Sequence, residues 1–491
     1  MNKRFKQLAF CIVCSLGIIL SSCGGGGGGG GGNGPTPINP NTWQPADKLT
    51  TKTPIKHLVV IFDENVSFDK YFGTYPNVTN SLGNPFYAKA GTPIPNNYIS
   101  HPELLTNNPN LFPPYAMAFN DNSFSANHSY FGEIDAYNNG AMDRFVQNNG
   151  GSQKVMGYFD GNTVTAIWNY AQNFALNDAF FGSTYGPTTI GSLNLIAGTT
   201  GTANALDSNA PILNGNLISN LDPIHDGCSY NFTTQTPNGN LVEIVNSKNI
   251  GDILTQNKIA WGFFAGGFKP LETSESGIKC SSEYYLHAQP FQYFATTANK
   301  LHLSPTDTIG VQDQANHQYD TDDFIDGLNK GQLPAVVFLK PSATNSGHPG
   351  FSNPIEEQAW IVNTLNLLQN SNAWNTTAVI IAYDDSDGAY DHVYPNQSAF
   401  NNIEGRAGYG PRMPFLLISP WSKTNYIDSN MIDQASILKF IEYNWSLPAL
   451  GVNSLDQYAN NFLTMFDFSK SPNDLNPKLF LNPNTGEVAN P

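Results

Sequence analysis

Two short acidic clusters are the residues most able to do chemistry. One, Asp-Glu-Asn at 63–65, follows the apolar stretch 57–62, and the other, Asp-Asp at 384–385, follows the apolar stretch 377–383. Ligands of open α/β sheets bind beyond the carboxyl ends of the strands, so both clusters are expected at one sheet edge. Acids gathered there repel one another unless a cation lies between them, which indicates a metal site. Either cluster alone is also typical of a helix cap or a solvated turn.

A hydroxyl-rich turn supplies the third candidate. Residues 181–189 precede the apolar stretch 193–197, and a hydroxyl at the start of a helix is well placed for an alkoxide and an incoming phosphate. The same composition is typical of a plain helix cap. His128, His287 and His348 lie in polar, Pro- or Gly-flanked settings, and their spacing does not show whether they converge.

Short apolar runs must form the elements that position these groups. Nearly continuous apolar runs indicate strands buried on both faces, as in a parallel sheet. Asn353, Pro354 and Glu356 match an N-cap, N1 and N3 and predict a helix that ends near residue 372. The predicted strands are 57–62, 335–339, 377–383 and 414–419. Strand, helix and strand in succession indicate a βαβ unit, and the fold class is therefore α/β.

The segment from about 200 to 330 lacks this rhythm and is rich in Asn, Gly, Thr and Pro. We interpret it as a loop-rich insertion over the site. Cys228 and Cys280 lie within it and are expected to form one disulfide, which closes a loop of about 50 residues. Two separate buried thiols are the alternative.

The N-terminus has the order of a bacterial lipoprotein leader. Basic residues precede an apolar run that is too short to span a bilayer, and Leu-Ser-Ser-Cys ends it at Cys23. We expect a signal peptide over 1–22 and a lipidated Cys23. A Gly- and Pro-rich tether over 23–50 is then followed by a catalytic domain over 51–491. These features predict an extracytoplasmic, membrane-anchored protein.

The composition excludes two broad classes of protein. Of 491 residues, 40% are hydrophobic and 12% aromatic, which is enough apolar surface for a folded core and argues against disorder. Lys and Arg number 23 against 39 Asp and Glu, for a net charge of −16. Nucleic acid is not an expected partner, because its binding depends on clustered cations.

A series of motifs in fixed order closely resembles the bacterial phosphoesterase family. This family contains phosphatidylcholine-hydrolysing phospholipases C and related acid phosphatases. The segments 55–61 and 64–73 resemble its opening signature. The match continues through His128 before 138–143, then 156–160, 186–189, 287–294, 347–350 and 383–392. The resemblance implies an alkaline-phosphatase-like α/β/α fold with a mainly parallel sheet.

The resemblance also assigns roles to residues at the matching positions. It implies that a divalent metal ion, either zinc or a calcium- or magnesium-like ion, is held by Glu64, Asn65, Asp384, Asp385 and Thr188. Thr188 is the implied nucleophile, and a phosphothreonine intermediate follows from it. His128, His287 and His348 are expected around the phosphoryl group, with His348 favoured as the acid/base.

Two departures from the family pattern leave alternatives open. Many relatives continue the nucleophile turn with Pro-Asn-Arg, where this chain has Ile-Gly-Ser at 190–192, so Thr189 competes with Thr188 for the role of nucleophile. The Asp-Asp pair at 384–385 is closer to the acid phosphatase branch. The expected activity is a phospholipase C on phosphatidylcholine-like lipids. A broad acid phosphatase and an inactive lipid-binding or adhesin module are the alternatives.

Overall fold

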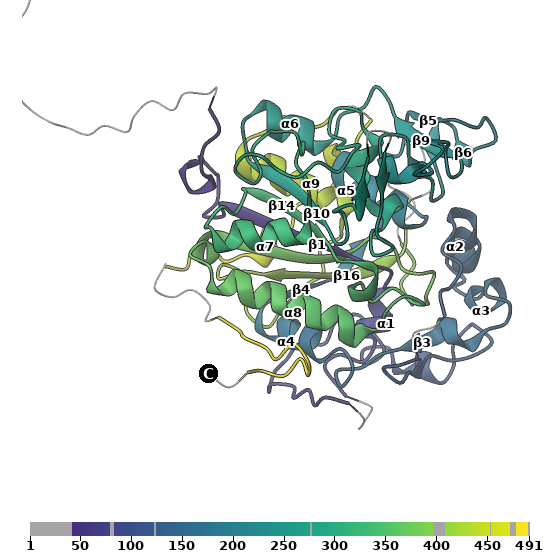
Figure 1. Ribbon diagram of the computed structural model, residues 1–491. Coiled ribbons are helices and arrows are strands. Elements are labelled where there is room, and N and C mark those ends of the chain that lie inside the picture. Colours follow the sequence, from purple (N-terminus) through teal and green to yellow (C-terminus); the bar gives the residue numbers. More distant parts are fainter. Residues whose placement is uncertain are drawn as a thin grey trace, which may run out of the picture. The chain divides into compact units, whose positions relative to one another are not determined.

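A nine-stranded sheet forms the centre of the protein (Figure 1). The computed structural model describes residues 42–78, 83–121, 124–274, 277–395, 408–451, 453–471 and 478–489. In spatial order the strands are β13 (Gln318–Asp320), β10 (Trp261–Ala265), β14 (Val336–Lys340), β1 (His57–Asp63), β15 (Thr377–Tyr383), β16 (Arg412–Ile418), β4 (Ala175–Phe181) and β17 (Tyr426–Asp428), and β18 (Ile432–Asp433) also pairs with β4. Only β16 runs antiparallel to its neighbours within this described sheet. The predicted α/β fold with a mainly parallel sheet is confirmed.

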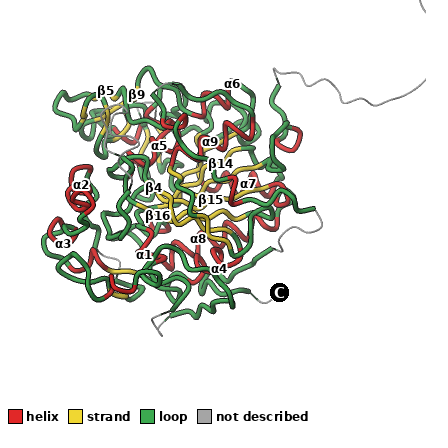
Figure 2. Tube along the Cα trace, turned by 180° about the vertical axis from the view of Figure 1, so that it is seen from behind, coloured by secondary structure: helices red, strands yellow, loops and turns green. Residues whose placement is uncertain are grey.

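Helices cover both faces of the sheet. On one face lie α5 (Thr188–Ala197), α6 (Ile250–Gln256) and α9 (Gln434–Trp445), and on the other lie α4 (Thr165–Asn173), α7 (Thr321–Asn329) and α8 (Pro354–Asn370). The view from behind shows the strands between these two helical layers (Figure 2). Shorter helices are α1 (Phe68–Phe72), α2 (Tyr130–Tyr137) and α3 (Phe145–Asn148).

Several two- and three-stranded sheets decorate this core. They pair β2 (Tyr115–Ala116) with β3 (Gly157–Tyr158), β6 (Ile212–Leu213) with β7 (Asn216–Leu217), and β11 (Glu272–Thr273) with β12 (Ile278–Lys279). A three-stranded sheet joins β5 (Ala203–Ala205), β9 (Leu241–Ile244) and β8 (Asp222–Pro223).

The four predicted strands and the predicted helix are confirmed. Every residue of β1 and β15 is buried, as a strand covered on both faces requires. The side chain of Asn353 caps α8 by accepting from the backbone N–H groups of Ile355 and Glu356. In turn, the Glu356 carboxylate accepts from the Asn353 N–H. This capping box fixes where the helix begins. The helix ends at Asn370, two residues before the expected end.

The segment 200–330 is divided differently from our expectation. Its first part is loop-rich, but β10, α7 and β13 belong to the central sheet and its covering layer. The apolar run of β10 is short and contains a glycine, and β13 has only three residues, Gln-Tyr-Asp. Hydrophobic periodicity is too brief in both strands to separate them from loops. The insertion therefore covers less of the chain than the sequence indicated.

The predicted signal peptide over 1–22 and the predicted lipidation of Cys23 lie outside the described residues and stay predictions. Residues 42–50, which the sequence assigned to the tether, contact the domain. The Trp43 ring lies 5.7 Å from the His317 ring, and Ala46 is buried. Among the described residues, no helix combines the length and apolar character needed to cross a membrane.

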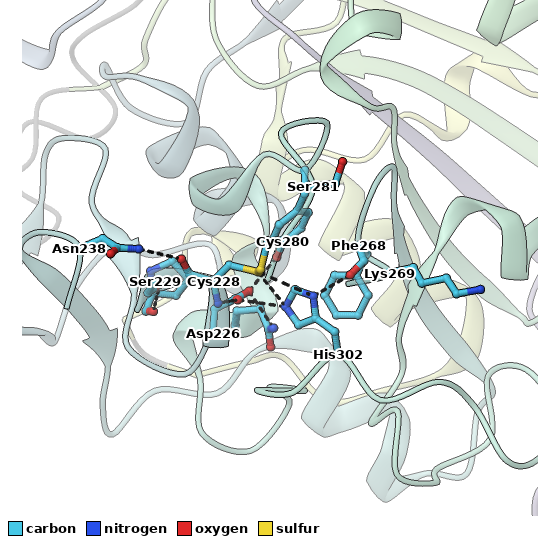
Figure 3. Close-up of a disulfide and its surroundings, with 12 residues drawn as sticks. Asp226, Cys228, Ser229, Asn238, Phe268, Lys269, Cys280, Ser281 and His302 are labelled. Carbon is cyan, nitrogen blue, oxygen red and sulfur yellow. Dashed lines mark hydrogen bonds and ion pairs between the residues drawn. A yellow bond between two sulfur atoms is a disulfide. The ribbon is translucent and has the colours of Figure 1, made fainter. Parts of the chain in front are cut away.

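The predicted disulfide between Cys228 and Cys280 is confirmed, and it lies beside a buried ion pair (Figure 3). His302 directs Nε2 at Asp226 (2.9 Å) and Nδ1 at the Phe268 carbonyl oxygen (2.6 Å). Both ring nitrogens of His302 therefore face acceptors. Burial favours a raised pKa for Asp226, but His302 and several hydrogen bonds lower the pKa below its usual range. The disulfide and this pair hold the insertion against the end of β10.

Replacing both cysteines, Cys228→Ser with Cys280→Ser, is expected to lower the free energy of unfolding by roughly 4 kcal/mol, because the crosslink closes a loop with a sequence separation of 52. Urea unfolding under non-reducing conditions measures the change, and wild-type protein treated with reductant is the matched control. Equal midpoints for the double variant and the oxidised wild type would contradict a stabilising disulfide.

Candidate active site

The carboxyl ends of four strands bring the candidate residues to one edge of the sheet. β1, β14 and β15 run parallel, and β4 has the same direction because β16 is antiparallel to both β15 and β4. Glu64 follows β1, Asp384 follows β15, and the turn that leads to Thr188 follows β4. The convergence expected from sequence is therefore present.

The two acidic clusters are in direct contact. The backbone N–H of Asn65 donates to Asp384 Oδ1 (3.3 Å), and the N–H of Val66 donates to the Asp385 carbonyl oxygen (2.9 Å). The Asp384 N–H donates to the carbonyl oxygen of Asp63 (3.2 Å). These bonds tie together residues that are more than 300 positions apart in the chain.

The carboxylates in this cluster are buried and close to one another. Burial, together with the neighbouring Asp384, raises the pKa of Glu64 to about 8. Burial also raises the pKa of Asp385 well above its usual range, and Asp384 adds to this effect while His128 opposes it. Buried acids with such pKa values favour a bound proton or a bound cation over free ionisation.

The hydrogen bonds of Asn65 indicate whether these residues fit a metal ion. Its Oδ1 is buried and has no hydrogen-bond partner among the described residues. Its Nδ2 donates to His348 Nε2 (3.1 Å), so the amide oxygen is turned away from that ring. The backbone at Asn65 has φ of 35°, a left-handed conformation that asparagine tolerates. An orphaned amide oxygen beside carboxylates is a suitable ligand for a hard cation.

The two candidate nucleophiles have different surroundings. Thr188 directs its hydroxyl at Asp385 Oδ2 (3.4 Å), inside the acidic cluster. Thr189 points elsewhere, because its hydroxyl donates to the His287 carbonyl oxygen (3.1 Å) and its N–H donates to Asn220 Oδ1 (2.9 Å). The geometry favours Thr188 as the nucleophile and gives Thr189 a structural role.

Gly191 explains part of the departure from the family pattern at 190–192. A Cβ at this position would collide with the carbonyl oxygen of Asp384. The same oxygen accepts a hydrogen bond from Gln434 Nε2 (2.7 Å). Helix α5 therefore approaches the loop that follows β15 and begins at Asp384, called the acidic loop below, more closely than a larger residue at position 191 would permit. This close approach places Thr188 beside Asp385.

The three histidines differ in charge. Burial alone would lower the pKa of His128, but Asp385 and Asp387 raise it to about 9. Burial and the nearby Lys340 lower the pKa of His287 to about 4. Burial also lowers the pKa of His348, although Asp387 opposes the change. His128 is therefore the cationic member of the set at neutral pH.

Hydrogen bonds also distinguish His128 from His348. His348 donates from Nδ1 to the Pro349 carbonyl oxygen (2.7 Å), which leaves Nε2 as the acceptor from Asn65. His128 donates from Nδ1 to the carbonyl oxygen of Ala126 (2.8 Å). This arrangement favours His128 over His348 as a proton donor, in contrast to the preference from sequence, and gives His348 the task of orienting Asn65.

Sequence reasoning missed two buried residues of the site. Glu133 accepts from the Gly186 N–H (2.9 Å) and from Ser386 Oγ (2.9 Å), so it joins the nucleophile turn to the acidic loop. Lys340 forms ion pairs with Glu64 and Asp384. Glu133 has no distinctive signal, because glutamate is ordinary in a first helical turn. A charge directly after the apolar run 335–339 could have identified Lys340.

Among the described residues, two groups of three side chains bring potential metal-ligand atoms within 4.8 Å of one another, and both groups are already engaged; neither includes Glu64, Asp384 or Asp385. Asp69, Asp391 and His392 surround Arg412, which donates to Asp69 (3.0 Å) and to Asp391 (3.0 Å). Cys228, Cys280 and His302 form the other group, and its sulfur atoms are joined in the disulfide. These groups serve structure, whereas the acidic cluster retains an unsatisfied oxygen.

Most of the chain matches a known protein family. Residues 55–448 match the model of the phosphoesterase family. The chain belongs to this family. The match includes both acidic clusters, the nucleophile turn and all three candidate histidines, so the whole site lies within the family region.

Several phosphoesterase relatives are phospholipases C by name. The non-hemolytic phospholipase C of Pseudomonas aeruginosa is 24% identical over 466 residues, which cover 87% of this chain and 59% of that protein. Phospholipase C B of Mycobacterium tuberculosis is 24% identical over 475 residues, covering 87% and 80%. This chain thus spans about three fifths of the Pseudomonas relative. A solved alkaline phosphatase superfamily protein from Vibrio parahaemolyticus matches 59% of this chain and 62% of its own at 14% identity, with a TM-score of 0.30.

Replacing Glu133 is expected to impair turnover without unfolding the protein. Glu133→Ala removes both acceptors that join Gly186 to Ser386, and loss of such a supporting contact lowers activity about 10- to 100-fold. Glu133→Gln retains one acceptor and should lie between the wild type and Glu133→Ala. Phosphoester hydrolysis rates measure the effect, and circular dichroism checks the fold. Full activity in Glu133→Ala would contradict the positioning role.

Proposed function

We propose that this phosphoesterase is a metal-dependent phospholipase C that cleaves phosphatidylcholine-like lipids to diacylglycerol and phosphocholine. One observation carries the proposal: the Thr188 hydroxyl faces Asp385 within a buried cluster of carboxylates, next to an orphaned amide oxygen. The names of the relatives support a phospholipid substrate. The family match supports hydrolysis of a phosphoric ester.

Glu64, Asn65, Asp384, Asp385 and Thr188 are the residues that would hold a divalent cation. The donor set consists of oxygen atoms, which favours a hard ion such as magnesium or calcium, with zinc as the alternative. When bound, such an ion would lower the pKa of the Thr188 hydroxyl and offset negative charge on the phosphoryl group.

The protein's own residues account for the remaining steps. The Thr188 oxygen forms a bond to phosphorus and passes its proton to the Asp385 carboxylate that it faces, as the bond from phosphorus to the glycerol oxygen breaks, which leaves phosphothreonine. The His128 imidazolium gives its proton to the departing alkoxide. Water then attacks phosphorus and neutral His128 accepts its proton, while Asp385 returns its proton to the departing Thr188 oxygen and phosphocholine is released. His348 holds the Asn65 amide in place throughout.

An exposed aromatic residue beside the site supports a lipid substrate. The Phe351 side chain is 61% exposed, and its ring lies 5.0 Å from the His348 ring and 5.6 Å from the Tyr285 ring. Its backbone N–H donates to the His348 carbonyl oxygen (3.0 Å), which fixes its distance from the site. A soluble phosphomonoester offers nothing apolar to such a surface, whereas diacylglycerol does.

The nucleophile prediction compares two neighbouring threonines. Thr188→Ala is expected to abolish turnover, because no other hydroxyl of the turn is directed at Asp385 in the described structure. Thr189→Ala should keep most of its activity and lose some stability, since it removes the hydroxyl contacts to the His287 carbonyl oxygen and to the Tyr293 hydroxyl. Turnover assays and thermal unfolding separate the two effects. Activity that survives in Thr188→Ala but not in Thr189→Ala would reverse the assignment.

The metal prediction concerns both substrate classes. Protein without residues 1–22 is incubated with phosphatidylcholine and with p-nitrophenyl phosphate, with and without EDTA. We expect diacylglycerol and phosphocholine from the lipid, and loss of both products in EDTA. Release of phosphate from the monoester alone would favour the acid phosphatase alternative, which is supported by the similarity of the Asp384-Asp385 pair to the acid phosphatase branch. Inactivity on both substrates in metal-replete buffer would favour an inactive lipid-binding module.

The lipid prediction changes the exposed aromatic residue alone. Phe351→Ser should lower hydrolysis of long-chain phosphatidylcholine about tenfold, because an apolar contact of this size is lost, and it should spare p-nitrophenyl phosphate. Tyr87→Ser is the matched control. Tyr87 is 76% exposed, and its backbone carbonyl oxygen accepts from the side chain of Gln172 near the end of α4. Helix α4 leads into the start of β4, so Tyr87 lies towards the edge of the sheet opposite the site. Equal losses on both substrates would contradict a lipid contact at Phe351.

A further inference from the structure

We propose that Lys340 is a built-in counter-cation of the acidic cluster, which stabilises the metal-free protein and competes with the divalent ion for Glu64 and Asp384. This inference rests on the metal site of the proposed function. It assigns a task to a residue that takes no part in the steps described above. The consequence is that the site exchanges one source of positive charge for another when a metal binds.

The contacts of Lys340 place its ammonium group within the cluster. Nζ lies 2.6 Å from Glu64 Oε1, 3.3 Å from Asp384 Oδ2 and 3.4 Å from the Asp63 carbonyl oxygen. The side chain is only 2% exposed. One ammonium group therefore touches three residues that come from the ends of two strands.

The sheet register brings Lys340 to this position. It is the last residue of β14, which pairs with β1 so that Leu339 lies opposite Ile61. Lys340 is therefore level with Phe62, the next-to-last residue of β1 and two residues before Glu64.

Other cations near the site are directed elsewhere. Lys70 Nζ lies 3.6 Å from Asp387 Oδ2, and His128 Nδ1 lies 3.7 Å from Asp387 Oδ1. Lys340 is the cation paired with Glu64 and Asp384 among the described residues. Without it, the two carboxylates would lie buried without a compensating charge, which strongly destabilises a fold.

Competition with a metal ion follows from the same geometry. A divalent cation that binds Glu64 and Asp384 must approach the Lys340 ammonium group, and like charges repel strongly where water is excluded. Removing the ammonium charge therefore has two opposite effects. The metal-free protein loses stability, and metal binding becomes tighter because the ion then supplies the missing positive charge.

The test uses Lys340→Met, which keeps an unbranched side chain one atom shorter than lysine and removes the charge. Unfolding temperatures are measured in EDTA and in titrations with magnesium, calcium and zinc. We expect a lower unfolding temperature than the wild type in EDTA, and a dissociation constant for the preferred ion at least about tenfold tighter than in the wild type. Lys340→Arg should remain close to the wild type in both measurements.

Lys70→Met is the matched control, because Lys70 is also a buried lysine that forms an ion pair, but its partner is Asp387. It should lose stability without a gain in metal affinity. An unchanged unfolding temperature of Lys340→Met in EDTA, or metal binding no tighter than in the wild type, would overturn the inference. A wild type that no metal stabilises would instead overturn the metal site of the proposed function, and the EDTA comparison would still test Lys340.

A double variant guards against simple misfolding. If Lys340→Met is too unstable to study, Glu64→Gln is added to remove the opposite charge. The double variant should recover part of the stability in EDTA relative to Lys340→Met, because only Asp384, rather than both Glu64 and Asp384, is then left without its paired cation. Losses that merely add would show that Lys340 contributes packing alone and would also overturn the inference.

Discussion

The burial of several carboxylates at one edge of the sheet is the constraint on which the rest of the site depends. Glu64, Asp384 and Asp385 are almost fully buried and lie at the ends of two neighbouring parallel strands. The repulsion between these carboxylates must be offset by protons, by fixed cations or by a bound metal ion. A fold that keeps such a cluster must hold its partners rigidly, and the surrounding contacts do so.

Each supporting contact brings a different part of the chain to this cluster. Glu133 from α2 joins the nucleophile turn to the acidic loop, and Gly191 lets α5 pack against the Asp384 carbonyl. His348 turns the Asn65 amide so that its oxygen stays unsatisfied. The position of Thr188 therefore depends on several elements, which together act as a preorganised frame for a charged reaction.

Sequence alone predicted the centre of the sheet and the acidic cluster, because both have strong local signals. Buried runs such as β1 and β15 are apolar throughout, and the cap of α8 is a local pattern at Asn353. It did not predict β10 and β13, whose signals are short, or the partners of His348 and Lys340. Those contacts join residues that are distant in the chain, and spacing contains no information about such pairs.

The distribution of charge explains why we propose His128 rather than His348 for the acid/base role. Both rings donate from Nδ1 to a backbone carbonyl, so the difference lies in what surrounds Nε2 and in the nearby acids. Asp385 and Asp387 keep His128 protonated, whereas His348 is deprotonated and accepts from Asn65. A proton donor must be protonated before the leaving group departs. Of the two rings, only His128 meets that requirement while leaving the Asn65 amide undisturbed.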